Sequence, residues 1–192
     1  MIYYENRLKL RETPPEQPYI AHQRLDYLLQ ERLKCKLPYS WKRSIFPDEP
    51  NNTLVSLRTA TPLNLPGEKA HELSLKVSDV LLCNTHFCFQ RKETVTTQDG
   101  EKVRSVPLDA DALPDILQRQ CEKFGFRLHS HSAGPAYKEH FQKKRHKFFM
   151  KVFPVSLVLE VVDIALAEEA IAYGIGHKRV FGYGQLTDME LL

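Results

Sequence analysis

Residues 111–131, DALPDILQRQCEKFGFRLHSH, join a helical pattern directly to a strand pattern. Four apolar residues recur at the spacing that places them on one helix face: Leu113, Ile116, Leu117 and Cys121. This spacing predicts a helix over 111–124, which Gly125 ends because glycine readily adopts the left-handed conformation found after helices. A strand is expected at 126–131. Such a unit requires a sheet against which the helix can bury its apolar face.

The residues on either side of this unit complete a six-element pattern. A strand at about 85–96 and a second arm at 101–106, around the turn Gln98-Asp99-Gly100, predict a hairpin before the helix. The elements expected after the unit are a strand at 148–162, a helix at 164–173 ended by Gly174, and a strand at 180–191. The second half of the chain therefore reads strand–helix–strand–strand–helix–strand.

The first half repeats this order less completely. A strand at 2–10 precedes a helix that begins between Thr13 and Pro18 and continues to Leu33. Its apolar stripe consists of Ala21, Leu25, Leu28, Leu29 and Leu33. The remaining elements are strands at 43–47 and 53–59, a loop with helix-breaking residues at 60–71, and a strand at 72–82.

A doubled βαββαβ order is typical of two tandem ferredoxin-like domains. We therefore predict an α+β fold with one domain over 1–83 and another over 84–192, the first lacking a well-formed second helix. Many RNA-binding modules share this order of elements, but a fold alone does not give a function.

The composition is that of an ordinary globular protein. The chain has 192 residues, 42% hydrophobic and 27% charged, with a formal net charge of +3. These values exclude a disordered chain. The N-terminal residues show no signal-peptide pattern, and no apolar run reaches the ~20 residues of a membrane span. We expect a cytoplasmic protein with no membrane partner.

The chain contains four cysteines, Cys35, Cys83, Cys88 and Cys121, which are expected to be reduced thiols in the cytoplasm. Cys83, His86 and Cys88 are the one hint of a metal site. The paired spacing of a zinc site is absent, however, and on a strand residue 83 points away from residues 86 and 88. Buried thiols are therefore the preferred interpretation, and no metal or cofactor is predicted.

The first helix carries a candidate catalytic edge. On a helical wheel, Tyr19, His22 and Asp26 fall together along one edge of the apolar stripe. Tyr19 and His22 are three residues apart, so their side chains can meet. A histidine exchanges protons near neutral pH, and a tyrosine hydroxyl can bind a reacting oxygen. Taken alone, this pattern more often marks a packed or solvated histidine.

Positive charge is concentrated in residues 134–149, GPAYKEHFQKKRHKFF. Five cations stand against the single acid Glu139: Lys138, Lys143, Lys144, Arg145 and Lys147. Aromatic residues are interleaved among them, as in segments that follow RNA phosphates. A solvated surface loop is the alternative. We expect this segment to be mobile in the absence of RNA.

A glycine-rich segment follows the last predicted helix: Gly174-Ile-Gly176-His-Lys178-Arg179-Val-Phe-Gly182-Tyr-Gly184. Its glycines could let main-chain N–H groups approach a phosphate, with Lys178 and Arg179 adding charge. The spacing matches neither a Walker A loop nor a dinucleotide motif. A tight turn before a glycine-rich edge strand is the alternative.

Three stretches together resemble the CasE family, the CRISPR RNA endoribonucleases of type I-E systems. They are Tyr19-Ile-Ala-His22-Gln23-x-Leu25, Glu122-Lys-Phe-Gly125-Phe126-Arg127-Leu128, and Gly174-Ile-Gly176 with Phe181-Gly182-Tyr-Gly184. The resemblance implies two ferredoxin-like domains, a CRISPR repeat RNA stem-loop as substrate, metal-independent cleavage, and partners in a type I-E surveillance complex.

The resemblance also assigns roles to residues. It implies that His22 and Tyr19 are catalytic and that the basic segment and the glycine-rich segment bind RNA. Without a metal, the 2′-hydroxyl of the RNA attacks the adjacent phosphorus and His22 supplies a proton to the leaving 5′-oxygen. The products would carry a 2′,3′-cyclic phosphate and a 5′-hydroxyl.

Two other functions fit the same sequence. A non-catalytic repeat-RNA-binding subunit of a CRISPR effector complex would keep its function in His22→Ala. A protein-interaction scaffold would not change its nucleic-acid affinity when Lys143, Lys144 and Arg145 are neutralised together. The family resemblance favours the enzyme over both.

Overall fold

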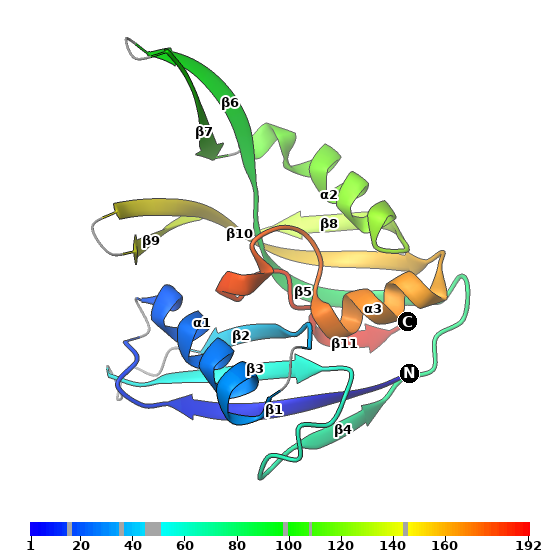
Figure 1. The fold of residues 1–192 in the computed structure, drawn as a ribbon. Coiled ribbons are helices and arrows are strands. Elements are labelled where there is room, and N and C mark those ends of the chain that lie inside the picture. Colours follow the sequence, from blue (N-terminus) through cyan, green and yellow to red (C-terminus); the bar gives the residue numbers. More distant parts are fainter. Residues whose placement is uncertain (15–16, 35–36, 45–50, 98–99, 108, 144–145) are drawn as a thin grey trace.

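The computed structural model describes residues 1–14, 17–34, 37–44, 51–97, 100–107, 109–143 and 146–192. Two antiparallel sheets lie side by side, and helices cover one face of each (Figure 1). Both sheets have the strand order of a ferredoxin-like domain, in which the first and third strands lie at the centre. The predicted α+β fold with two ferredoxin-like units is therefore confirmed.

The first sheet has the order β2-β3-β1-β4 and is covered by α1. Its elements are β1 (Ile2–Leu10), α1 (Pro18–Asp26), β2 (Ser40–Ser44), β3 (Thr53–Thr59) and β4 (Lys69–Glu72). A π-helical turn, Tyr27–Arg32, extends α1. Residues 60–68, between β3 and β4, form no helix, as the sequence predicted.

Helix α1 lies on this sheet because its buried stripe matches the apolar face of the strands. Ala21, Leu25 and Leu29 are buried against Trp41, Val55 and Leu57. Pro18 begins the helix, where its missing N–H costs no helical hydrogen bond.

The second sheet has the order β11-β5-β10-β8 and is covered by two helices. Its elements are β5 (Val80–Cys88), α2 (Leu113–Lys123), β8 (Phe126–Ala133), β10 (His146–Val161), α3 (Ile164–Tyr173) and β11 (Thr187–Leu191). The predicted face of α2 is buried, and Gly125 follows the helix with φ +79°. The predicted bounds of α3 are confirmed, and Gly174 ends it.

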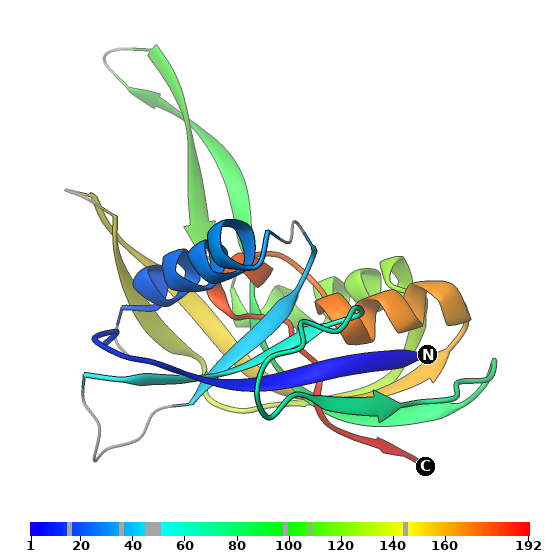
Figure 2. The same cartoon turned by 60° about the horizontal axis from the view of Figure 1, so that its bottom comes forward.

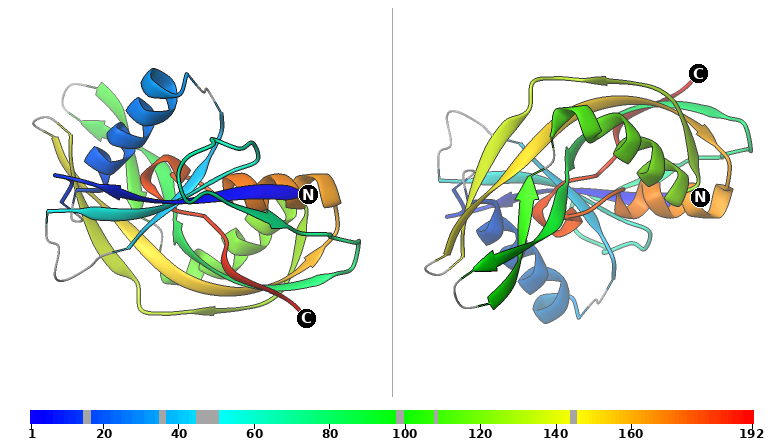
Figure 3. Two further views of the ribbon diagram at one scale, coloured as in Figure 1. Left: turned by 90° about the horizontal axis from the view of Figure 1, so that it is seen from below. Right: turned by 90° about the horizontal axis from the view of Figure 1, so that it is seen from above.

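Two hairpins extend from the second sheet. β6 (Gln90–Thr97) and β7 (Gly100–Pro107) form a separate two-stranded ribbon that stands away from the body of the molecule (Figure 2). β9 (Tyr137–Lys143) pairs with the first part of β10. β9 lies at the end of the molecule opposite to the two chain termini (Figure 3).

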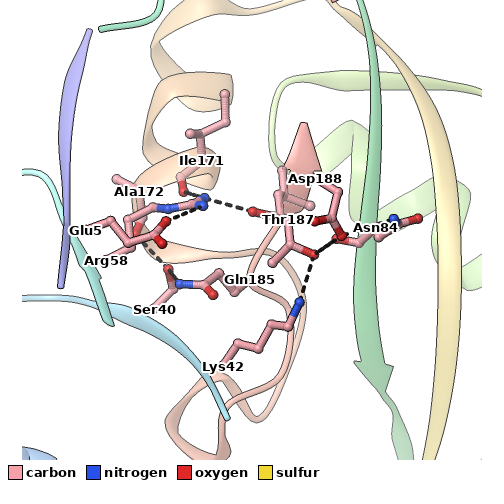
Figure 4. Close-up of polar contacts among 11 residues, drawn as sticks. Glu5, Ser40, Lys42, Arg58, Asn84, Ile171, Ala172, Gln185, Thr187 and Asp188 are labelled. Atoms are coloured by element: carbon pink, nitrogen blue, oxygen red, sulfur yellow. Dashed lines mark hydrogen bonds and ion pairs between the residues drawn. The ribbon is translucent and has the colours of Figure 1, made fainter. Parts of the chain in front are cut away.

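Polar contacts join the two sheets (Figure 4). Arg58 of β3 is buried, and its Nη1 donates to the carbonyl oxygens of Ile171, at 3.0 Å, and Leu186, at 2.8 Å. Ser40 Oγ donates to the Ala172 carbonyl at 2.9 Å. The carbonyls at the end of α3, which no helical N–H can reach, thus accept hydrogen bonds from the first sheet.

Several predicted strands were misplaced. The predicted strand 85–96 is divided between β5 and β6, and β4 lies partly within the predicted loop 60–71. Residues 73–79 of the predicted strand 72–82 are irregular, and β5 begins only at Val80. The last strand is short, because a 3₁₀ turn occupies Arg179–Phe181 and β11 starts at Thr187. β2 begins at Ser40, earlier than the predicted 43–47, of which residues 45–47 lie outside the described residues.

In the basic segment, residues 137–143 and 146–149 belong to the β9–β10 pair, so the alternative of a surface loop is wrong for this part. The proposed boundary between residues 83 and 84 falls inside β5. We propose the connection 73–79 as the division instead, because no element crosses it. Within the described ranges, no helix is long and apolar enough to cross a membrane.

Candidate active site

One half-buried edge of α1 carries the predicted catalytic residues. The side chain of His22 is 17% exposed, and its Nε2 lies 3.3 Å from Oδ2 of Asp26, one turn further along the helix. Its Nδ1 lies 3.4 Å from Oη of Tyr39, and Tyr39 donates from Oη to Oδ1 of Asp26 at 2.7 Å. His22 therefore lies against a Tyr39–Asp26 pair.

Burial and charge act on His22 in opposite directions. Partial burial lowers the pKa of the His22 imidazole because a charged ring is less well solvated there, and the Asp26 carboxylate raises it. Burial, followed by the hydrogen bond to Asp26, raises the pKa of the Tyr39 hydroxyl. Tyr39 is therefore a neutral hydrogen-bond donor at physiological pH.

The aromatic rings around His22 come from three distant parts of the chain. Tyr19 lies 6.3 Å from His22 between ring centroids, as the wheel predicted. Phe181, from the glycine-rich segment, lies 6.0 Å from His22 and 6.3 Å from Tyr19. Phe141 of β9 contacts Phe181 at 5.1 Å. The structure thus brings the helix edge, the glycine-rich segment and the basic hairpin together.

The glycines at 174–184 shape this segment. A Cβ on Gly184 would lie 1.9 Å from the Ile175 carbonyl oxygen, and one on Gly176 would lie 2.8 Å from the Phe87 ring. Gly182 lies against the Trp41 ring, and Gly174 against Gly184. All four glycines have φ between +78° and +86°. Only glycine can follow this path without strain.

Several main-chain N–H groups of this segment are used within the protein. The N–H groups of Gly174, Gly182 and Gly184 donate to the main-chain carbonyl oxygens of Ala170, Arg179 and His86, respectively. These three N–H groups are therefore already hydrogen-bonded in this structure. The glycine-rich sequence pattern predicted that main-chain N–H groups of this segment would approach a phosphate. Any phosphate contact of this segment falls to its side chains and its remaining N–H groups.

The two cations of the segment differ. Lys178 has a left-handed backbone, with φ +64°. Arg179 donates from Nη1 to the carbonyls of Tyr173 and Gly174, at 3.4 and 3.3 Å, and its guanidinium lies 5.8 Å from the centre of the Phe124 ring. Arg179 thus helps to hold the segment onto α3 and α2.

The β9–β10 pair presents the predicted basic segment. Lys138 is exposed, with Nζ 5.1 Å from the centre of the Phe149 ring. Lys143 and Lys147 lie on the paired strands, where Lys143 is opposite His146 and Lys147 opposite Gln142. Lys144 and Arg145 lie outside the described residues.

The single acid of that segment turns inward. Glu139 has a side chain that is 9% exposed, forms an ion pair with Arg43 of β2, and accepts a hydrogen bond from Tyr183 Oη. Its charge is therefore compensated inside the protein. Among the described side chains of the segment's cations, that of Lys138 is exposed.

Sequence reasoning did not single out Tyr39, Arg43 or Phe181 as parts of the site. Phe181 was visible within the glycine-rich motif, but nothing in the pattern assigned it to His22. Tyr39 and Arg43 lie in a stretch without periodicity before and within β2. Only the tertiary packing brings Tyr39 and Phe181 to α1, and Arg43 to Glu139 of β9.

Three of the four cysteines belong to the second unit, Cys83 and Cys88 on β5 and Cys121 on α2, whereas Cys35 lies outside the described residues. Cys83 and Cys121 belong to the main core of this unit, and Cys88 belongs to a separate cluster with Phe141 and Tyr183. Burial raises the pKa of each of these three thiols to about 12. Among the described residues, no group of histidine, cysteine and acidic side chains is arranged to hold a metal ion.

No protein-family model and no curated protein matches the sequence. Solved structures do match over the whole chain. Cas6e of Escherichia coli K-12 has a TM-score of 0.69 and 19% identity, with both chains fully covered. Cse3 of Thermus thermophilus, bound to RNA as a pre-cleavage complex, has a TM-score of 0.64 and 16% identity over 100% of this chain and 98% of that chain.

A chain of a CRISPR RNA-guided surveillance complex has a TM-score of 0.64 and 12% identity, over 98% of this chain and 100% of that chain. At such identities the likeness concerns the path of the backbone. This chain has the fold of the Cas6e and Cse3 CRISPR proteins.

Proposed function

We propose that this chain is a CasE-type endoribonuclease that binds the stem-loop of CRISPR repeat RNA and cleaves it, without a metal, to make mature guide RNA. The observation that carries the proposal is the meeting of His22, Tyr19 and Phe181, which joins the candidate catalytic helix edge to the glycine-rich segment. The shared fold supports it, since one structure with that fold is a CRISPR endoribonuclease bound to RNA.

The proposed reaction is an internal transesterification. The 2′-oxygen attacks phosphorus and loses its proton to solvent, while the bond from phosphorus to the 5′-oxygen breaks. His22 gives a proton to that leaving oxygen, a form of help that contributes ~10²–10⁴-fold to rate. Tyr19 orients the 2′-hydroxyl. The products carry a 2′,3′-cyclic phosphate and a 5′-hydroxyl.

RNA binding is assigned to the surface around this site. The exposed Lys138 and the other cations of 134–149 would follow the phosphates of the stem, where recognition depends on shape and charge more than on base edges. Lys178 and Arg179 would contact the RNA from the glycine-rich segment, whose glycines act by shaping its path.

A second candidate is a subunit that binds repeat RNA without cleaving it. It is favoured by the match to a chain of a surveillance complex. The enzyme and the binding subunit both fit a place in such a complex, so cleavage itself must distinguish them.

The test incubates end-labelled repeat RNA, from the CRISPR array of the same genome, with protein in EDTA. Wild type should cleave once per repeat and leave a cyclic phosphate, and His22→Ala should bind RNA but lose about 10²-fold or more in rate. His129→Ala is the matched control, because His129 is an exposed histidine of β8 paired with Glu160. Tight binding with no cleavage by wild type would favour the binding subunit.

A further inference from the structure

Asp26 makes two contacts that bear on His22. Its Oδ1 accepts a hydrogen bond from Tyr39 Oη at 2.7 Å, and its Oδ2 lies 3.3 Å from His22 Nε2. The short bond to Tyr39, a partly buried side chain, fixes the plane of the carboxylate. The second oxygen is thereby aimed at the imidazole.

We propose that Asp26, held in place by Tyr39, is a positioning residue that keeps the Nε2 proton of His22 in place and leaves Nδ1 to transfer the catalytic proton. This inference rests on the proposed function. It extends that function by assigning a role to each ring nitrogen and to two residues outside the predicted catalytic pair.

The assignment of the two nitrogens follows from the donors present. A carboxylate only accepts hydrogen bonds, so Nε2 carries a hydrogen toward Asp26. Tyr39 gives its own hydroxyl proton to Asp26, so its oxygen offers lone pairs to Nδ1. Both ring nitrogens thus face acceptors, which favours the charged ring, with Nδ1 donating toward Tyr39. In the neutral ring the hydrogen stays on Nε2, beside the carboxylate, which is the stronger acceptor, and Nδ1 is unprotonated.

The contact of Nδ1 with the uncharged Tyr39 hydroxyl is the one that RNA can replace. The Nδ1···Oη distance is 3.4 Å, which is long for a hydrogen bond. In the reaction, Nδ1 loses its proton to the 5′-oxygen as the phosphorus–oxygen bond breaks. His22 returns to the neutral form with a hydrogen on Nε2, still directed at Asp26, and then takes up a proton from solvent at Nδ1.

Among the described groups around the His22 ring, Asp26 is the carboxylate that acts on its pKa. The titratable groups of the described residues that face the ring are Asp26 and Tyr19 from α1 and Tyr39 from the segment before β2. From the glycine-rich segment the ring meets Phe181, which is apolar. The negative charge of Asp26 favours the protonated ring, against the effect of burial.

The sign of the pH effect follows from these contacts. His22 must be protonated to donate, so the cleavage rate falls as pH rises through its pKa. Asp26→Asn removes the charge that raises the pKa of His22, while burial still lowers it. The cleavage rate of this variant should therefore begin to fall at a lower pH than that of wild type. Tyr39→Phe keeps the charge but frees the carboxylate to turn, so it should act in the same direction and less strongly.

The experiment measures single-turnover cleavage of repeat RNA at saturating protein from about pH 5.5 to about pH 8.5, a range that extends about one unit below and about two units above the reference pKa of histidine. Asp26→Asn should cleave within about twofold of wild type at the acidic end and about tenfold slower at the basic end. RNA affinity should not change. Asp115→Asn, an exposed change in α2, is the matched control.

A second readout separates this inference from the proposed function. In RNA-free protein, the His22 ring signals are assigned by their loss in His22→Ala and titrated by NMR; Asp26→Asn should titrate at lower pH than wild type. An equal loss of rate at every pH, with an unchanged titration, would overturn the inference and leave the nuclease intact. Absence of cleavage by wild type would overturn the proposed function, and the titration would still decide whether Asp26 controls the charge of His22.

Discussion

Single glycines determine where Phe181 lies. The segment turns back on itself, so that Ile175 N donates to Gly184 O at 2.8 Å while Gly184 N donates to His86 O at 2.9 Å. This double attachment leaves no space for a side chain at residue 184. The position of an aromatic ring beside His22 therefore depends on a residue that has no side chain.

Gly184→Ala should destabilise the fold by about 3 kcal/mol or more, because it adds a steric clash to an unfavourable backbone angle. Gly67→Ala is the matched control: Gly67 has the same φ of +81°, but nothing lies within 4 Å of its added Cβ. It should cost only about 1 kcal/mol. Urea unfolding measures both. Equal losses for the two variants would show that the close approach to Ile175 does not matter.

At the scale of elements, helix α1 illustrates what periodicity can predict. A wheel of its sequence places Tyr19, His22 and Asp26 on one edge, and the structure confirms their contacts. The same reasoning could not find Tyr39 or Phe181, because contacts between segments far apart in the chain have no period. The part of the candidate site that lies on α1 could thus be predicted from the sequence of that helix.

The misplaced strands have physical reasons as well. In 73–79 the apolar alternation does not mark a strand: Leu75 is buried and Leu73 packs against the same core, but Val77 is 59% exposed. In β9 the side chains do alternate between the inside and the surface, but a charged residue stands at one of the inward positions, so the hydrophobic pattern does not show it. The inward positions of β9 include the charged Glu139 as well as Phe141. A buried ion pair across elements, here with Arg43, is invisible to a hydrophobic pattern.

The β9–β10 pair should contribute to RNA affinity through charge. Lys138→Ala should weaken repeat-RNA binding and reduce the slope of log affinity against log salt by about one, as expected for one lost phosphate contact. Lys69→Ala is the control, because Lys69 is also exposed but lies on β4, away from the hairpin. Filter binding over a range of salt concentrations measures both slopes. Equal slopes in Lys138→Ala and wild type would remove this lysine from the interface.

At the scale of the whole molecule, the site depends on how the two sheets are joined. His22 lies on α1 of the first unit and Phe181 in the second unit, so their contact requires a fixed arrangement of the two units. The buried Arg58 supplies much of it: it also stacks on Tyr3, with Cζ 4.6 Å from the ring centre, and lies 3.5 Å from Glu5. Arg58 takes no part in the proposed reaction. Its guanidinium donates hydrogen bonds to two carbonyl oxygens of the second unit and so joins the two units.

Arg58→Met should lower the free energy of unfolding by about 2–4 kcal/mol, because it leaves the carbonyls of Ile171 and Leu186 buried without a donor. Arg127→Met is the control, since the side chain of Arg127 is 60% exposed in its ion pair with Glu160. That change should cost less than about 1 kcal/mol. Thermal unfolding followed by circular dichroism compares them. A stable Arg58→Met protein would show that the joint does not need these bonds.

Trp41 is the one tryptophan of the chain, and it lies at this joint. Its ring is fully buried beneath Gly182, and its Nε1 donates to the Val180 carbonyl at 3.2 Å. The molecule therefore contains an intrinsic fluorophore at the place where the glycine-rich segment rests on the first sheet. The fluorescence of this indole reports whether the glycine-rich segment is packed against the first sheet. Its emission maximum should lie at a shorter wavelength when the ring is buried than when water reaches it.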